Sequence, residues 1–350
     1  MANGIYRIGI VGASSLVGKE LSDELGESVL GASDFVLLDE DEAAGQVTAT
    51  GDEVSFIQRL EVSSFDRMDF VFFAGSAEVT KKYWQDARRA GASIVDLTYA
   101  LAGEKDVRAR APWVSEALAA KASAGGTELD LNTPAVVGGH PAAVMLALVA
   151  ARLQAKLPLK SVAATVLEPA SENGRLAMDE LHQQTVNLLS FQTLPKEQYD
   201  AQVAFNLLPS LGEAAKVKLT VAEKRIRDEY AEFSAGALPP LALQVVQAPV
   251  FHGYVMSVLV EVGKAATVEQ IEAALAGEHV DVVGGESDPP SNLSAAGQED
   301  IMVRVSEAVG GEGVARFWLW MAADNLKLAA LNAIACAGEL RRLRPQGKVQ

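Results

Sequence analysis

The chain has 350 residues, enough for two domains, and its 49% apolar and 22% charged residues are typical of a globular protein with a large core. A formal net charge of −16 argues against nucleic acids and anionic membrane surfaces as partners. The single cysteine excludes an internal disulfide, and residues 1–12 carry no secretion signal, so we expect a cytoplasmic protein.

The first predicted element is a strand, turn and helix unit near the N-terminus. An apolar run at 8–11 meets a small-residue turn at 12–15, and a helical pattern follows from Leu16 to Leu21. This order is typical of nucleotide-binding βα units, whose turn N–H groups receive a pyrophosphate. Ser15 stands where the dinucleotide pattern asks for its middle glycine, and an α/β unit that binds nothing is the alternative. The residues assigned to cofactor binding here are Gly12, Ala13, Ser14, Ser15, Leu16, Val17 and Gly18.

A second strand is predicted at 35–38, and four acidic residues follow it at 39–42. Asp39 is placed to grip a ribose hydroxyl, as acidic residues do about twenty positions after a glycine turn. The clustered carboxylates would repel a 2′-phosphate, which favours NAD over NADP. A solvated acidic loop is the alternative.

Strands and helices then alternate. Strands are predicted at 70–74 and 93–97, and a helix at 80–90 lies between them. This alternation predicts a parallel sheet with ligands at the carboxyl ends of its strands. Gly75, in the turn after the first of these strands, is therefore also assigned to cofactor binding.

The pattern changes near residue 134. A strand at 135–137 leads through His140 and Pro141 into an apolar helix at 142–154, in which proline suits a first helical position. The glycines and proline interrupt this apolar stretch, so no membrane span is expected. Further strands are predicted at 161–167, 243–247, 255–262 and 314–320, with a helix ending at 189, a Gly/Ser/Pro-rich loop at 284–298 and a long helix at 324–342.

These pieces together resemble the aspartate-semialdehyde dehydrogenase family over nearly the whole chain. The segments that carry the likeness are 12–18 (GASSLVG), 73–77 (FAGSA), 95–101 (VDLTYAL), 205–209 (FNLLP) and 324–333 (DNLKLAALNA). The resemblance implies an α/β fold with a Rossmann-type parallel-sheet dinucleotide-binding domain at 1–134 and 325–350. An α+β domain at 135–324 would carry catalysis and dimerisation.

The resemblance also implies a cytoplasmic NAD(P)-dependent enzyme of amino-acid biosynthesis that forms a homodimer. A paralogous subunit is an alternative partner. Asn325 would face the nicotinamide end of the cofactor, although a polar residue at a helix N-terminus explains it equally well. No metal site is expected.

The family's reaction needs a cysteine nucleophile, a proton-relay histidine, a glutamine and a substrate-clamping arginine. The positions that match these residues hold Pro141, Tyr254, Glu168 and Gln247, and the expected phosphate-binding arginine falls near Ala102. His140 and His252 lie close in sequence to the replaced residues. The sole thiol, Cys336, is expected to be a buried packing residue.

Two hypotheses follow for the altered site. The first is a catalytically degenerate pseudoenzyme, a dinucleotide-capable dimer that acts by binding, either to a partner or as a sensor of an unidentified small molecule. The second is an active NAD(P)-dependent oxidoreductase on a carbonyl substrate, in which Tyr254 donates to the carbonyl oxygen and His140 and Glu168 form a proton-transfer pair. Satisfied polar residues lining an abandoned pocket are the alternative to any catalysis.

Overall fold

The structure, a computed structural model, describes residues 6–31, 33–40, 45–50, 53–119, 129–130, 133–309 and 314–344. The chain divides into two compact units. The first comprises Met1–Trp113, Gly126–Gly139 and Ala329–Gln350, and the second comprises Val114–Gly125 and His140–Leu328. The boundaries expected from the sequence, 134/135 and 324/325, lie a few residues before the divisions at 139/140 and 328/329, whereas residues 114–125, expected in the first domain, fall in the second unit.

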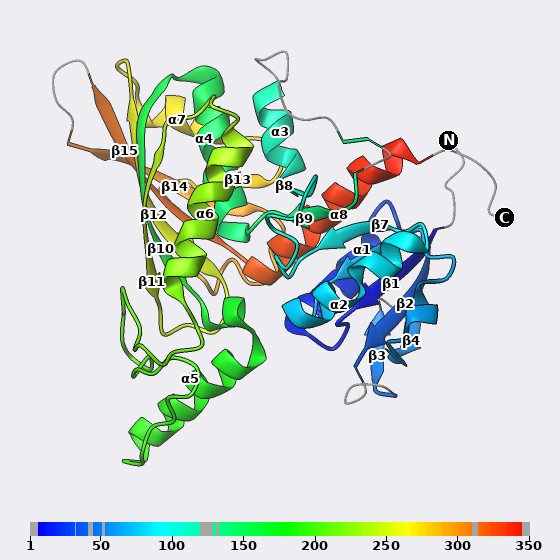
Figure 1. Cartoon of the computed structure of the whole chain (residues 1–350). Helices are drawn as coiled ribbons and strands as arrows, with labels where there is room; N and C mark the ends of the chain where they lie inside the picture. The colour runs from blue at the N-terminus through cyan, green and yellow to red at the C-terminus, as the bar shows by residue number, and fades with distance from the viewer. Residues whose placement is uncertain are drawn as a thin grey trace. The chain divides into compact units, whose positions relative to one another are not determined.

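A seven-stranded parallel sheet forms the centre of the first unit as the structure describes it, with strand order β5-β2-β1-β6-β7-β9-β8 (Figure 1). Its strands are β1 (Arg7–Val11), β2 (Asp34–Asp39), β5 (Gln58–Arg59), β6 (Phe70–Phe73), β7 (Ser93–Asp96), β8 (Arg108–Arg110) and β9 (Val136–Gly138). A separate hairpin, β3 (Val47–Thr50) with β4 (Glu53–Phe56), is not predicted from the sequence. The helical elements are α1 (Leu16–Glu27), η1 (Val62–Phe65) and α2 (Ala77–Arg89).

Both faces of this sheet are buried, as parallel sheets require. Ile8 of β1 packs with Leu21 of α1 and with Ala333 of α8 (Asn325–Leu343), a helix that enters the first unit at Ala329. On the opposite face, Val11 packs with Trp84 of α2. The strands are therefore near-continuous apolar runs, which is what made them recognisable in the sequence.

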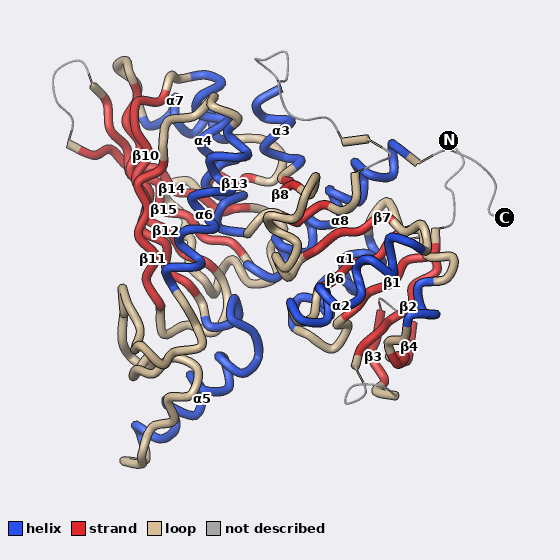
Figure 2. The backbone as a smooth tube through the Cα atoms, viewed as in Figure 1, coloured by secondary structure: helices blue, strands red, loops and turns tan. Residues whose placement is uncertain are grey.

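The second unit holds a six-stranded mixed sheet with order β11-β10-β12-β15-β14-β13 (Figure 2). Its strands are β10 (Leu159–Glu168), β11 (Leu241–Gln247), β12 (Tyr254–Val262), β13 (Val280–Val282), β14 (Ile301–Ala308) and β15 (Ala315–Ala323). Its helical elements are α4 (Pro141–Lys156), η2 (Ala170–Asn173), α5 (Gly174–Leu189), α6 (Leu219–Ser234) and α7 (Val268–Leu275), and α3 (Pro112–Ala119) spans the division between the units. Helices α6 and α7 and strand β14 are not predicted from the sequence.

The predicted fold class is confirmed: a Rossmann-type parallel sheet and a second domain that mixes helices with a largely antiparallel sheet. In the second unit α4 and α6 pack on each other and on β10 and β11. Trp318 and Trp320 of β15 are partly exposed, at 44% and 39%. No helix in the described part of the chain is long and apolar enough to cross a membrane.

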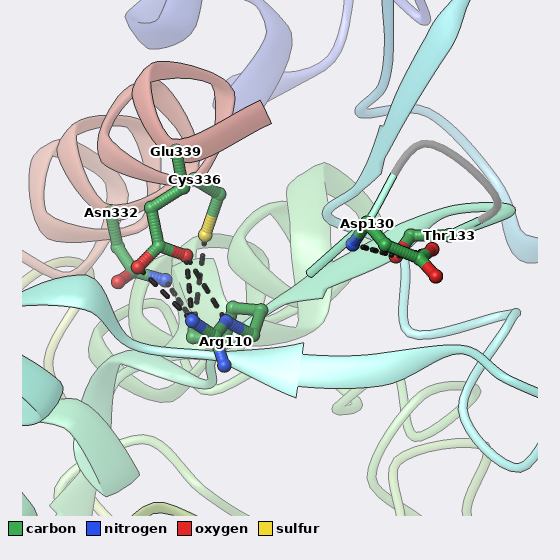
Figure 3. Close-up of polar contacts among 6 residues, drawn as sticks. All are labelled: Arg110, Asp130, Thr133, Asn332, Cys336 and Glu339. Atoms are coloured by element: carbon green, nitrogen blue, oxygen red, sulfur yellow. Dashed lines mark hydrogen bonds and ion pairs between the residues drawn. The ribbon is translucent and has the colours of Figure 1, made fainter. Parts of the chain in front are cut away.

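The only thiol of the chain lies in the core of the first unit, as expected. Cys336 is fully buried on α8, and its Sγ contacts the backbone oxygen of Arg110 at 3.6 Å (Figure 3). Arg110 forms a salt bridge with Glu339 at 2.9 Å, and Asn332 donates to the same backbone oxygen at 3.1 Å. Burial, the largest cause, raises the pKa of Cys336 well above its ordinary value, which keeps the thiol protonated.

Candidate functional site

In the first unit, the glycine turn after β1 packs closely against the turn after β6. Gly12 has φ +84°, and a Cβ on it would lie 2.2 Å from the Cα of Gly75. A Cβ on Gly18 would lie 2.2 Å from the backbone oxygen of Gly12. Packing therefore requires glycine at these three positions.

Hydrogen bonds of the Ser15 and Asp39 side chains stabilise this turn. The Ser15 hydroxyl accepts the backbone N–H of Gly18 at 2.8 Å, which caps α1, and donates to the backbone oxygen of Ala74 at 2.7 Å. The Asp39 carboxylate accepts the backbone N–H of Ser14 at 2.9 Å. An acidic side chain at the end of β2 thus faces the turn, as a ribose-binding residue would. Asp41 and Glu42 of the predicted acidic cluster lie outside the described residues.

His140 begins the polar cluster of the second unit. It is the N-cap of α4, and its Nδ1 accepts the backbone N–H of Ala142 at 3.2 Å. Its Nε2 lies 3.2 Å from Oε1 of Glu172. Because Nδ1 is an acceptor, the imidazole is neutral and Nε2 donates to Glu172. Burial, followed by the charge of Arg225, lowers the pKa of His140 to about 3, in agreement with this tautomer.

Glu172 is the acidic partner that sequence reasoning missed. The proton-transfer hypothesis paired His140 with Glu168, but the carboxyl at the imidazole is that of Glu172, one short 3-10 turn further on. Burial raises the pKa of Glu172 to about 7, against the opposing effect of hydrogen bonds from Asn325 and Tyr254. The Tyr254 ring also lies 6.0 Å from the imidazole, centroid to centroid.

Asn325 connects three segments of this cluster. Its Oδ1 accepts from the Ser171 hydroxyl at 3.1 Å and from the backbone N–H of Gly253 at 3.0 Å. Its Nδ2 donates to Glu172 Oε2 at 3.2 Å. Asn325 is fully buried in the second unit, so the structure places this residue, predicted from the family to bind the cofactor, within the Glu172 network. Half-buried His252 precedes Gly253 on the same turn.

Gln247, Glu168 and Tyr254 lie in a row across three adjoining strands. Glu168 and Gln247 are register partners at the carboxyl ends of β10 and β11. Tyr254 begins β12, and its neighbour Val255 pairs with Leu167. Three positions far apart in the sequence therefore meet at one edge of the sheet, close to where α4 begins at Pro141.

Glu168 and Gln247 each hold one buried oxygen without a partner. Glu168 Oε1 accepts from Asn173 Nδ2 at 2.8 Å, while Oε2 has no hydrogen-bond partner among the described residues. Gln247 Nε2 donates to the backbone oxygens of Glu168 and Ala248, each at 3.1 Å, and its Oε1 likewise has no partner there. Turning this amide over would set its oxygen against two carbonyl oxygens, so the orientation is determined by the contacts.

Helix α6 adds two charged residues, Glu229 and Arg225, to the cluster. Glu229 accepts the backbone N–H of His140 at 2.6 Å. Burial raises the pKa of Glu168 and of Glu229 to about 8, and Arg225 opposes both shifts. The charge of Arg225 therefore acts on three carboxyls, those of Glu168, Glu172 and Glu229.

Two family models match the chain. Residues 7–123 match the model described as semialdehyde dehydrogenase, NAD binding domain, and residues 150–328 match the semialdehyde dehydrogenase dimerisation domain. The matches fall on the first parallel sheet and on the mixed sheet with its helices.

Similar proteins align with this chain over nearly its full length and nearly their own. A USG-1 protein homolog of Pseudomonas aeruginosa is 31% identical over 95% of this chain and 96% of its own, and an aspartate-semialdehyde dehydrogenase of Rickettsia conorii is 25% identical over 96% and 97%. The solved structure of a probable aspartate-semialdehyde dehydrogenase from Pseudomonas aeruginosa is 28% identical, covers 97% of this chain and 99% of its own, and superposes with a TM-score of 0.82. Sheet order, domain matches and these relatives agree that the chain belongs to the semialdehyde dehydrogenase family.

Proposed function

We propose that the chain is a dinucleotide-binding homodimer that lacks the phosphorylating semialdehyde dehydrogenase activity and acts by binding a small molecule. The observation that carries the proposal is Pro141 at the first position of α4. The family resemblance assigns the nucleophilic cysteine to this position. A proline ring has no atom that can attack an aldehyde, so the covalent step has no nucleophile there.

No other thiol is placed to replace it. Cys336 is the single cysteine of the chain, and it is buried in the first unit with a raised pKa. Thiolate attack needs an accessible, deprotonated sulfur, which this environment opposes.

The substrate-side positions also differ from the family pattern. Gln247 stands where an arginine would clamp a substrate carboxylate, and both donors of its amide are used by backbone carbonyls. Tyr254 replaces the proton-relay histidine, and Glu168 the glutamine. A bidentate carboxylate clamp is therefore absent at this position.

The cofactor side supports dinucleotide binding. The glycine turn between β1 and the N-terminus of α1 is of the kind that receives a pyrophosphate, and Asp39 beside it favours a free ribose hydroxyl and hence NAD over NADP. Soaking crystals of the chain with NAD and with NADP tests this: we expect NAD over residues 12–18. If both soaks leave the turn empty, the cofactor proposal fails. A cytoplasmic location and a homodimer formed by the matched dimerisation domain complete the proposal.

The activity experiment follows reduced nicotinamide formation at 340 nm with aspartate semialdehyde, phosphate and either dinucleotide. We expect no rate above that of the mixture without protein. A rate proportional to protein concentration would contradict the proposal.

The buried cluster supports a second candidate, an oxidoreductase that transfers hydride without a covalent intermediate. Tyr254 would donate to a carbonyl oxygen, and Glu172, with a pKa of about 7 and contacts to both Tyr254 and His140, would supply the proton in place of Glu168. A screen of small carbonyl compounds with NADH tests it. Absence of turnover, or turnover unchanged in Tyr254→Phe, rejects this candidate.

A further inference from the structure

The two unpartnered oxygens at the ends of β10 and β11 point to the class of ligand. Glu168 Oε2 and Gln247 Oε1 are buried, belong to side chains of residues 1% and 0% exposed, and have no hydrogen-bond partner in the described part of the chain. Buried polar atoms are nearly always satisfied, and those that are not call for an explanation such as a ligand or an ordered water. The missing partner of Gln247 Oε1 is a hydrogen-bond donor, and so is the missing partner of Glu168 Oε2 once this carboxyl is ionised, since amide and carboxylate oxygens accept.

The register of β10 and β11 places the Glu168 and Gln247 side chains next to each other. Glu168 and Gln247 are register partners on parallel strands, so their side chains leave the sheet on the same face. The Asn173 amide fixes one carboxyl oxygen of Glu168, and two backbone carbonyls fix the Gln247 amide nitrogen. Neither unpartnered oxygen can turn to another partner without breaking these bonds.

The surrounding charge selects the kind of donor. Glu172 lies close enough to Glu168 for its charge to act on it, and Arg225 is the cation that opposes the two carboxyls. Tyr199, whose buried hydroxyl has no partner among the described residues, also feels the charge of Glu168. Once Glu168 is ionised, an incoming cation would pair with it, whereas a carboxylate would be repelled by the ionised Glu168 and would meet a second acid and the acceptor oxygen of Gln247.

We propose that Glu168 Oε2 and Gln247 Oε1 form a subsite for a primary ammonium group, so that the ligand bound here is a small cationic amine and not a carboxylate. The ammonium would donate one N–H to each oxygen and form an ion pair with Glu168. This inference rests on the proposed function, in which the chain acts by binding.

Amine binding at this subsite should depend on pH. Because burial raises the pKa of Glu168 to about 8, the free protein holds a proton there at neutral pH, and ion pairing requires its release. An alkylammonium ion stays charged to about pH 9, by analogy with lysine. Affinity should therefore rise up to about tenfold per pH unit between about pH 6 and 8, with about one proton released per ligand below that pH.

The experiment titrates the full-length chain with ethylammonium and n-butylammonium chloride by calorimetry in two buffers of different ionisation enthalpy, with sodium butyrate and n-butanol as matched probes. We expect amine binding with proton release, and binding of neither butyrate nor butanol. Glu168→Gln should remove the pH dependence and weaken amine binding at least about tenfold, while Gln247→Met should weaken it without removing the pH dependence. Glu307→Gln, which changes an exposed carboxyl, should behave as wild type.

Amine binding that is insensitive to Glu168→Gln, or tighter binding of butyrate, would overturn the inference. So would a crystal structure with amine present that shows only a water between the two oxygens, a result that does not depend on the stability of any variant. Failure of this inference is separate from failure of the proposed function: absent amine binding with absent semialdehyde turnover rejects the subsite alone, and semialdehyde turnover rejects the proposed function whatever the amines do.

Discussion

At the scale of single residues, the cluster depends on side chains that join segments distant in sequence. Asn325 is the clearest example, because its amide bonds a serine of η2, a backbone N–H of the turn before β12 and Glu172. The neighbouring Asp324 acts mainly as a helix cap, since its Oδ1 accepts the backbone N–H groups of Leu326 and Lys327 at the start of α8, and its Oδ2 accepts the exposed backbone N–H of Gly297. The two residues look alike in the sequence, as polar residues at a helix N-terminus.

This contrast predicts different stability losses for the two positions. Asn325→Leu removes the partners of three buried polar groups, each worth roughly 1–3 kcal/mol, so we expect a loss of at least about 2 kcal/mol in the free energy of unfolding. Asp324→Asn keeps the capping oxygen and loses only the acceptor of the exposed Gly297 N–H, which water can replace, so it should cost less than about 1 kcal/mol. Urea unfolding of both variants measures the difference. Equal losses would show that the Asn325 contacts are not what stabilises this region.

At the scale of elements, the approach of the β1–α1 turn to the β6–α2 turn depends on two facing glycines. Gly12→Ala would add both a strained left-handed backbone and a Cβ 2.2 Å from the Gly75 backbone. Gly103 is the matched control, since its φ is +91° and a Cβ there meets no atom within 4 Å.

We therefore expect Gly103→Ala to lose about 1 kcal/mol, the backbone cost alone, and Gly12→Ala to lose more than about 2 kcal/mol because one of the turns must also move. Unfolding midpoints in guanidinium chloride compare the two. If Gly12→Ala proves no worse than Gly103→Ala, the close approach is not needed for stability.

Some elements of the fold can be predicted from the local sequence, and others cannot. The β1, turn and α1 unit follows from local chemistry: an apolar run, small residues and a serine cap lie next to one another in the chain. Helix α6 escaped prediction, yet it brings Glu229 to the backbone N–H of His140, 89 residues away. The sequence pattern pairs His140 with Glu168, whereas the 3-10 turn η2 places Glu172 at the imidazole. The sequence motifs predict where these strands end. They do not predict which side chains meet, because those contacts depend on tertiary packing.

At the scale of the whole molecule, the two units treat buried acids differently. Asp96, fully buried in the first unit, accepts three hydrogen bonds of 2.6–2.9 Å from Thr98 and Leu101. Glu168 in the second unit is equally buried and has one oxygen unpartnered among the described residues. Local hydrogen bonds offset the desolvation of Asp96, whereas the desolvation of Glu168 Oε2 is offset by no hydrogen bond among the described residues.

The pH dependence of stability should reveal these acids. Burial raises the pKa of Glu168 and Glu229 to about 8 and of Glu172 to about 7, from 4.5. The folded state then binds more protons than the unfolded state above pH 4.5, so their contribution to stability is complete below that pH and is lost as pH rises to 8. His140, with its pKa lowered to about 3 from 6.5, acts in the opposite direction only as pH falls below 6.5.

We therefore expect the free energy of unfolding to fall between about pH 6.5 and 8, by at most about 1.4 kcal/mol per pH unit for each proton lost, and to level off above pH 8. Glu229→Gln retains an oxygen for the His140 N–H and cannot ionise, so its curve should be shallower than that of wild type and cross above it at high pH. Urea unfolding at pH 6, 7, 8 and 9 measures both curves, with the exposed-site variant Glu307→Gln as control. Parallel curves for wild type and Glu229→Gln would mean that Glu229 is already ionised at pH 6, and the burial argument for this cluster would be wrong.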